Sequence, residues 1–198
     1  MPPLGIRMMA SLELALSAGE LKLSSTDPDE QPFLDYRYFQ QEEDLRRMRE
    51  AVRLCVSLGE HERFNDIIES RIEPTEEELA SDESLNTYIL KEVTTGQHIS
   101  GTCKMGPDSD PMAVVDQYCS VRGITGLSVV AASVKLKITR SGGSHATVLM
   151  MSERAVEFIA PAYSLPSKNK NNNGLHSVLI YRSMVSTPFW SASYTHPR

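Results

Sequence analysis

The chain has 198 residues, which is enough for one sizeable domain or for a domain with an appendage. Its 40% hydrophobic and 23% charged residues are typical of a soluble globular protein. The formal net charge of −6 argues against a nucleic-acid partner, because binding to phosphates requires clustered lysine and arginine side chains.

The cysteines and the apolar segments bear on cellular location. Cys55, Cys103 and Cys119 include no CxxC pair and do not resemble a disulfide framework, so a reducing, cytoplasmic location is expected. No run is long and apolar enough to span a bilayer. Near the N-terminus, Glu13 interrupts the apolar stretch, which favours a strand or a helix over a secretory signal.

The first third of the chain carries strand and helix patterns. Leu21 and Leu23 alternate with polar residues and predict a half-buried strand, and residues 33–38 are expected to form a second extended segment. A helix then begins at the acidic residues 42–44 and can stop at Gly59. Its apolar face consists of Leu45, Met48, Val52, Cys55 and Val56.

Helix caps mark two further elements. Thr75 precedes three glutamates and fits a capping box, which predicts a short helix. Ser81 or Asp82 can cap the next helix, and Gly96 is expected to end it. Residues 97–126 are rich in Gly, Pro, Asp and Ser and predict loop.

The second half of the chain carries weaker patterns. Residues 127–132 form a short apolar run that is consistent with a buried strand. Residues 145–160 have helical periodicity. The segment 167–173 is polar and low in complexity, which predicts a poorly ordered tail beyond residue 161.

His98 stands between a predicted helix and a glycine-rich loop, where it is well placed to face a cleft. A neutral imidazole can accept a proton from an alcohol, which is the task of a general base. A lone histidine is more often a surface or structural residue, so its position alone leaves both interpretations open. Cys103 offers a further alternative, a Cys–His nucleophile pair.

His145 follows a Ser-Gly-Gly-Ser loop and begins a predicted helix. Glycines let a backbone approach a ligand closely, and the start of a helix suits a bound or developing anion. The same residues also occur in ordinary loops. The small residues 131–133 end the predicted strand, where they either admit a cofactor or serve packing alone.

Together these blocks resemble the C-terminal portion of the glucose-methanol-choline (GMC) oxidoreductase family. That family carries a His, two residues and Gly-Thr-Cys-Arg-Met-Gly, and this chain has His98 followed by Gly-Thr-Cys-Lys-Met-Gly at 101–106. Ala-Val-Val-Asp at 113–116 and the block at 121–129 match the family's next motifs. Residues 141–146 fall on the family's closing Ser-Gly-Asn-Thr-Asn-Ala motif. Taken as a whole, the resemblance covers about residues 15–160.

The resemblance implies FAD-dependent oxidation of a small-molecule alcohol. His98 would accept the hydroxyl proton, the carbon-bound hydrogen would pass to the flavin as hydride, and His145 would hydrogen-bond the substrate oxygen or share the proton. Gln97 is a candidate for the substrate side, and Cys103 takes a packing role. The positions that resemble the family's flavin contacts are Ala131, Ala132, Ala146 and Thr147.

This chain also departs from the family. The family binds the ADP half of FAD through a GxGxxG motif, which this sequence lacks. The family's Asp-Ala-Ser is Ala-Ala-Ser at 131–133. A truncated or split gene is the simplest account. The isolated chain is expected to be poorly stable or to bind a partner, and to be inactive by itself. No metal ligand is assigned, because the five histidines lack spacings such as HExxH.

Two hypotheses follow. Either the chain joins a separate FAD-binding chain to complete an alcohol oxidoreductase, or it is a non-catalytic remnant or interaction module. The predicted class is α+β, with a mainly antiparallel substrate-domain sheet, flanking helices, and the last strand and helix of an incomplete FAD-binding domain. The expected divisions are an N-terminal segment 1–14, a GMC C-terminal region 15–160 and an unrelated tail 161–198.

Overall fold

A computed structural model describes residues 5–138, 144–162 and 188–195 of the chain. The chain divides into two compact units, one comprising Met1–Gly96 with Thr187–Arg198 and the other comprising Gln97–Ser186. Each unit is described by itself. Helices accompany a small antiparallel sheet, so the predicted α+β class is confirmed.

The main sheet belongs to the first unit and is built around its last strand in sequence, β6 (Pro188–Thr195). β1 (Gly5–Ser11) runs antiparallel to β6 along its whole length. β4 (Arg71–Glu73) and β5 (Thr94–Thr95) also pair with β6 in antiparallel fashion. Residues 188–195 form this strand although they lie within the tail that was expected to be poorly ordered. The three-part division of the chain stays a prediction.

A two-stranded hairpin follows β1. β2 (Glu20–Lys22) pairs with β3 (Phe33–Asp35), so the predicted strands at these positions are confirmed. The expected burial of the leucines is wrong, because Leu23 is 82% exposed. Gly19 allows the hairpin to close, since a Cβ atom there would lie 2.3 Å from the carbonyl oxygen of Asp35.

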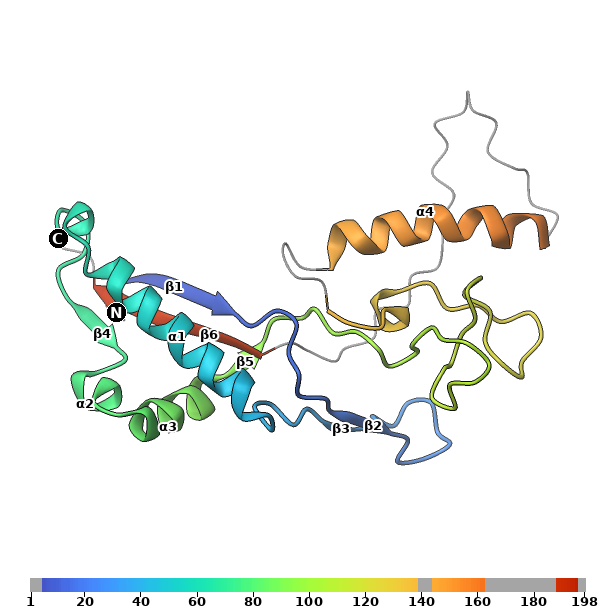
Figure 1. Cartoon of the computed structure of the whole chain (residues 1–198), viewed down its shortest axis with the longest axis horizontal. Coiled ribbons are helices and arrows are strands. Elements are labelled where there is room, and N and C mark those ends of the chain that lie inside the picture. The colour runs from blue at the N-terminus through green and yellow to red at the C-terminus, as the bar shows by residue number, and fades with distance from the viewer. Residues whose placement is uncertain (1–4, 139–143, 163–187, 196–198) are drawn as a thin grey trace, which may run out of the picture. The chain divides into compact units, whose positions relative to one another are not determined.

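Helix α1 (Glu42–Gly59) carries the core of the first unit and lies alongside β1 and β6 (Figure 1). Its predicted apolar face is buried, and Met48 and Val52 are fully enclosed. Leu85, Tyr88 and Ile89 of α3 (Asp82–Glu92) pack into the same cluster, which Leu12 completes.

A buried carboxylate anchors the start of α1. The side chain of Asp44 accepts hydrogen bonds from the amide of Leu16 at 2.9 Å and from the amide of Ser17 at 2.6 Å. It also accepts one from the Ser17 hydroxyl at 2.6 Å, and that hydroxyl in turn accepts one from the amide of Gln41 at 3.0 Å. These bonds fix the segment between β1 and β2 onto the first turn of α1.

The predicted caps are confirmed, and one predicted boundary is wrong. Thr75 forms a capping box at α2 (Glu76–Leu79), and Ser81 caps α3. α3 ends at Glu92 and does not reach Gly96. The β-branched residues 93–95 are better suited to an extended backbone, and two of them pair with β6 as β5.

Among the residues of the second unit that the structure describes, there is little regular structure besides α4 (His145–Ala162), which confirms the predicted helix. Residues 97–126 form loops, as expected. The predicted strand at 127–132 is wrong. Its backbone makes isolated contacts with the preceding loop, and a 3₁₀ turn (Ala132–Val134) follows. Only the end of this segment is buried: Val130 packs with Cys119 and with Ala155 of α4, whereas Leu127 is 46% exposed.

Among the described residues, no helix is long and apolar enough to cross a membrane.

Candidate functional site

His98 lies at the entrance to the loop region of the second unit and is half-buried. The preceding residue, Gln97, has a left-handed backbone with φ of 58°, an uncommon conformation for a residue with a side chain. This turn redirects the chain immediately before the histidine.

The His98 ring contacts the residue that precedes α4. Its Nδ1 atom lies 3.3 Å from the hydroxyl oxygen of Ser144 and 3.4 Å from the Ser144 amide nitrogen, which donates to it. Ser144 is followed directly by His145, the first residue of α4. The structure therefore brings together the two sequence blocks that hold the predicted catalytic residues, which are 46 positions apart at this contact.

The other predicted site residues differ in accessibility. His145 and Ala146 are exposed at the start of α4, and Thr147 beside them is half-buried. Ala132 is half-buried, whereas the side chain of Ala131 is packed inside the unit. A ligand could therefore meet the first turn of α4 directly, but at Ala131 only the backbone could take part. Residues 139–143, which include the glycines before Ser144, lie outside the described residues.

The loop after His98 is fixed by the 3₁₀ turn. The carbonyl of Ser133 accepts hydrogen bonds from the amides of Gly101 and Cys103, both at 3.0 Å. The amide of Met105 donates to the carbonyl of Val134 at 3.0 Å. Gly101 has a φ of 91°, which a side chain would disfavour. The Gly-Thr-Cys block thus holds the backbone that follows His98 against residues 133–134.

Sequence reasoning missed the polar residues that shape the next loop. Arg122 donates to the carbonyl oxygen of Gly106 at 2.5 Å and forms an ion pair with Asp108. Lys104 pairs with Asp110 at 2.7 Å, and this hydrogen bond lowers the pKa of the Asp110 carboxyl. The only sequence signal for these interactions was the presence of charged residues in a glycine- and proline-rich segment. That signal did not specify which residues pair with each other.

The alternative Cys–His pair finds no support in the geometry. His98 contacts Ser144, and no hydrogen bond between His98 and Cys103 occurs among the described residues. Of the other cysteines, Cys119 belongs to the small core of this unit, where burial raises the pKa of its thiol. A thiol held protonated in this way is a poor nucleophile.

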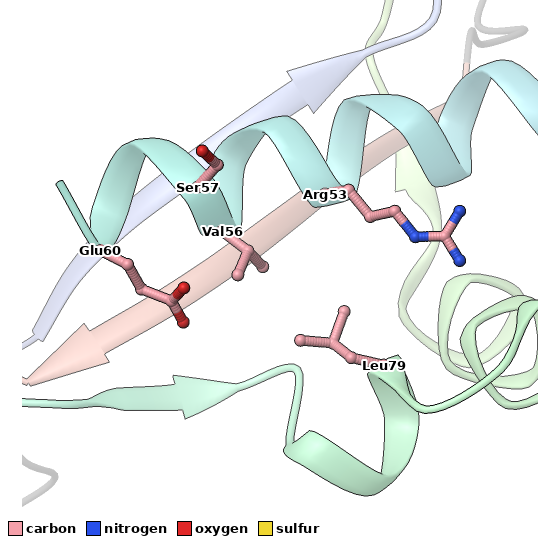
Figure 2. A pocket seen from close by; sticks show the side chains of 5 residues that line it. All are labelled: Arg53, Val56, Ser57, Glu60 and Leu79. Carbon is pink, nitrogen blue, oxygen red and sulfur yellow. The ribbon is translucent and has the colours of Figure 1, made fainter.

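A hollow in the first unit has a different character. It has a volume of about 480 Å³ and is lined by Arg53, Val56, Ser57 and Glu60 from α1 and its end, with Leu79 of α2 opposite (Figure 2). Its charged side chains already have partners, since Arg53 pairs with Asp82 and Glu60 pairs with Arg71. It contains none of the predicted site residues and offers no group poised for chemistry.

In the part of the chain that the structure describes, no cluster of three or more His, Cys, Asp or Glu side chains could hold a metal ion.

Comparison with known proteins places this arrangement in a family. A sequence model described as GMC oxidoreductase matches residues 15–152. The oxygen-dependent choline dehydrogenase of Staphylococcus aureus (strain JH9) is 37% identical over 144 residues, covering 72% of this chain and 25% of that protein. The enzyme of the same name from Rhizobium johnstonii is 32% identical over 166 residues, covering 84% of this chain and 30% of that protein.

Solved structures agree with the sequence relatives. Pyridoxine 4-oxidase from Mesorbium loti superposes with a TM-score of 0.64 at 28% identity, covering 75% of this chain and 28% of that one. A formate oxidase variant from Aspergillus oryzae RIB40 superposes with a TM-score of 0.65 at 30% identity, covering 76% of this chain and 26% of that one.

The chain belongs to the GMC oxidoreductase family, a family of FAD-dependent oxidoreductases, and the resemblance noted in its sequence is confirmed over residues 15–152. It spans 25% and 30% of the length of the two choline dehydrogenases named above.

Proposed function

We propose that this chain supplies the substrate-side residues of an FAD-dependent oxidoreductase that oxidises an alcohol. The observation that carries the proposal is the contact between His98 and Ser144, because it joins the two blocks that hold the proposed catalytic residues. In this proposal His98 is the general base, His145 hydrogen-bonds the substrate oxygen, and Gln97, which is exposed, lies on the substrate side.

The chemistry assigned to the histidines is proton transfer. A neutral His98 accepts the hydroxyl proton of the alcohol, which makes loss of the carbon-bound hydrogen as hydride favourable. Bound FAD would supply the acceptor for that hydride. If the two imidazoles lie close together, they titrate as a coupled pair, and the pH dependence of the reaction belongs to the pair.

The described residues fit one edge of a flavin and not the whole cofactor. The accessible first turn of α4 at Ala146 and Thr147, where backbone amides have no acceptor within the helix, suits an electron-rich ring edge, and the backbone at Ala131 and Ala132 could approach it. The GxGxxG motif that binds the ADP half is absent from the sequence. We therefore propose that a separate FAD-binding chain completes the site.

The exposed face of α4 supports such a partner. Leu149 is 50% exposed and Met150 is 64% exposed, and both follow Ala146 at helical spacing. Further along the same face the exposed residues are charged, and Arg154 pairs with Glu157. The apolar part of this exposed face thus lies near the N-terminal end of α4, the end that carries His145. We propose that the FAD-binding chain docks there.

Reconstitution tests the proposal. The chain is mixed with an FAD-loaded fragment of a choline dehydrogenase relative that contains GxGxxG, followed by size-exclusion chromatography. We expect a yellow complex whose flavin absorbance bleaches when choline or another small alcohol is added without oxygen. A mixture that stays separate, or a complex that no alcohol in the set reduces, would contradict the proposal.

A matched pair of variants tests the docking face. Leu149→Glu is expected to weaken the complex at least about tenfold, because a charge would be buried in the interface. Leu54→Glu on α1 is the control, since Leu54 is 60% exposed and belongs to the other unit. Equal weakening by both variants would argue against docking at α4.

The second candidate is a non-catalytic interaction module. It is favoured by the missing GxGxxG motif and by Ala131, which stands where the family has an aspartate. A complex that retains FAD but is never reduced by alcohols, with no further effect of His98→Gln, would support this alternative.

A further inference from the structure

The main sheet of the first unit depends on a strand that lies outside the family match. β4 and β5 fall within residues 15–152, which match the GMC oxidoreductase model, whereas β6 follows at 188–195. Among the described strands, β1, β4 and β5 all pair with β6, and none of these three pairs with another (Figure 1). The backbone groups of β4 and β5 therefore require a neighbour that the matched residues do not supply.

β6 pairs completely on one side and incompletely on the other. It is in register with β1 along the whole of that strand. On the opposite side, the register shifts at β4, and β5 contributes only two residues. Within the described part of the chain, residues 190–192 have no pairing partner on that side. Pro188, which pairs with Thr95, has no N–H to donate, so a strand without proline there could make a bond that β6 does not.

We propose that the position of β6, between β1 on one side and β4 and β5 on the other, is a docking slot for an antiparallel strand of the FAD-binding chain. β6 fills this slot in the chain alone, and the incoming strand displaces it. The identity of the partner rests on the proposed function. The chain covers only 25% and 30% of two choline dehydrogenase relatives, so the remaining length is the source from which such a strand is expected.

Strand addition suits this exchange because it relies on backbone hydrogen bonds. The incoming strand can therefore differ from β6 in its side chains. The apolar cluster between α1 and α3 is built from residues between Leu12 and Ile89, all of which precede β6 in sequence. No other described element follows β6 along the chain. The exchange thus leaves the core side chains of α1 and α3 in place.

Competition for one slot fixes the direction of every effect. The FAD-binding chain meets an open slot only in those molecules whose β6 is released, so its apparent Kd equals the intrinsic Kd divided by that fraction. Loosening β6 therefore tightens the complex, and fixing β6 weakens it. A strand that served only to stabilise the first unit would have the opposite effect, because loosening it would damage the partner's binding surface.

A double proline substitution in the full chain loosens β6. Neighbouring residues of a strand direct their N–H groups to opposite sides, so Ser191→Pro with Ala192→Pro removes one donor that faces β1. We expect the Kd for the FAD-loaded choline dehydrogenase fragment to fall at least about tenfold in a binding titration. Ser191→Thr with Ala192→Val keeps both donors and is the control. Weaker binding by a folded proline variant than by the control would overturn the inference.

A disulfide between β1 and β6 tests the opposite change and decides the matter if the proline variant fails to fold. Met9 and Ser191 are cross-strand partners, and such partners have Cα atoms about 4.5–5.5 Å apart, within reach of a disulfide. Met9→Cys with Ser191→Cys should bind the fragment at least about tenfold more weakly when oxidised than when reduced. The natural chain, taken through the same oxidation and reduction, controls for its own three free cysteines. Equal affinity of the cross-linked and reduced forms would contradict the displacement of β6.

Hydrogen exchange identifies the strand that leaves and separates this inference from the proposed function. In the complex of the natural chain, the amides of residues 188–195 should lose protection while those of β1 keep it. A complex in which β6 stays protected would contradict the inference and leave the proposed function intact. A complex that releases β6 but is reduced by no alcohol would contradict the proposed function alone.

Two further outcomes also decide the inference. If the natural chain does not bind the fragment, binding by the proline variant supports the slot, and failure of both to bind rules it out. If the proline variant forms dimers that exclude the fragment in size-exclusion chromatography, the slot belongs to a second copy of the chain, and the assignment to the FAD-binding chain is wrong.

Discussion

The two units of the chain are stabilised in different ways. The first has a continuous apolar cluster in which α1 and α3 bury large side chains such as Met48, Leu85 and Ile89. Among the described residues of the second unit, the core cluster is small and consists of Cys119, Val130 and Ala155, with further residues such as Val115 and Val134 buried beneath loops that backbone hydrogen bonds hold together.

The difference indicates that the two units have different roles. Loops whose backbone groups bond to one another can place side chains such as His98 in positions that a regular element would not offer. They bury little apolar surface, so they contribute less to the free energy of unfolding. We infer that the first unit provides stability and that the second provides the candidate site, with Leu149 and Met150 left for a partner.

Removing bulk from the core of the first unit should have the largest effect. Met48 is fully buried, so Met48→Ala is expected to lower the free energy of unfolding by about 2–5 kcal/mol through lost burial and a cavity. Leu54→Ala on the same helix is the control and should cost less than about 1 kcal/mol, because Leu54 is mostly exposed. Chemical denaturation measures both, and equal losses would show that the apolar cluster around α1 is not what stabilises the first unit.

The buried carboxylate should have the next largest effect. Asp44→Ala is expected to cost about 3 kcal/mol, because the amides of Leu16 and Ser17 lose their acceptor. Glu43→Gln is the control, since its pair with Arg46 is exposed and should contribute less than about 1 kcal/mol. If denaturation found no difference between these variants, Asp44 would not anchor the segment before β2.

Thiol labelling directly compares how readily the two units open locally to expose a buried cysteine. Burial raises the pKa of both Cys55 in the first unit and Cys119 in the second. We expect Cys119 to react with an alkylating reagent at least about tenfold faster than Cys55, a difference of about 1.4 kcal/mol in opening free energy. Mass spectrometry on a Cys103→Ser background measures both rates, and faster labelling of Cys55 would reverse the comparison.

The same thiols give a pH dependence with a definite sign. A thiol whose pKa is raised in the folded state contributes stability that is complete below its unfolded pKa, about 8.5. That contribution is lost as the pH rises through the raised value. Stability should therefore decline in alkaline solution, and Cys55→Ala should remove part of the decline.

The loop ion pair should have the smallest effect. Arg122→Met is expected to cost about 1 kcal/mol, since its pair with Asp108 is exposed but its bond to the carbonyl of Gly106 is partly buried. Hydrogen exchange should increase in residues 104–122 and not in α1. Arg154→Met, which breaks an exposed pair on α4, is the control and should leave that loop unchanged.

Local patterns predicted much of this fold. The buried face of α1, the caps at Thr75 and Ser81, and helix α4 all follow from residues close together in sequence, and all are confirmed. The predicted strand at 127–132 failed because a short apolar run indicates burial without specifying a pairing partner. Val130 and Ala131 are buried through packing, and the rest of the segment is held by scattered loop bonds.

Such local patterns did not predict the contacts between residues that are far apart in sequence. Nothing near Asp44 in sequence indicates that it accepts bonds from residues 16 and 17. The family resemblance assigned His98 and His145, but only the three-dimensional arrangement revealed that Ser144 contacts the His98 ring. The roles of the individual site residues stay predictions.

The position of β6 has a consequence for synthesis of the chain. This strand follows all the others in sequence, yet it pairs with β1, β4 and β5. During translation, the three earlier strands emerge from the ribosome without the neighbour that their backbone groups require. Their edges stay open to other strands until residues 188–195 arrive, so nascent chains should depend on chaperones for as long as β6 is missing.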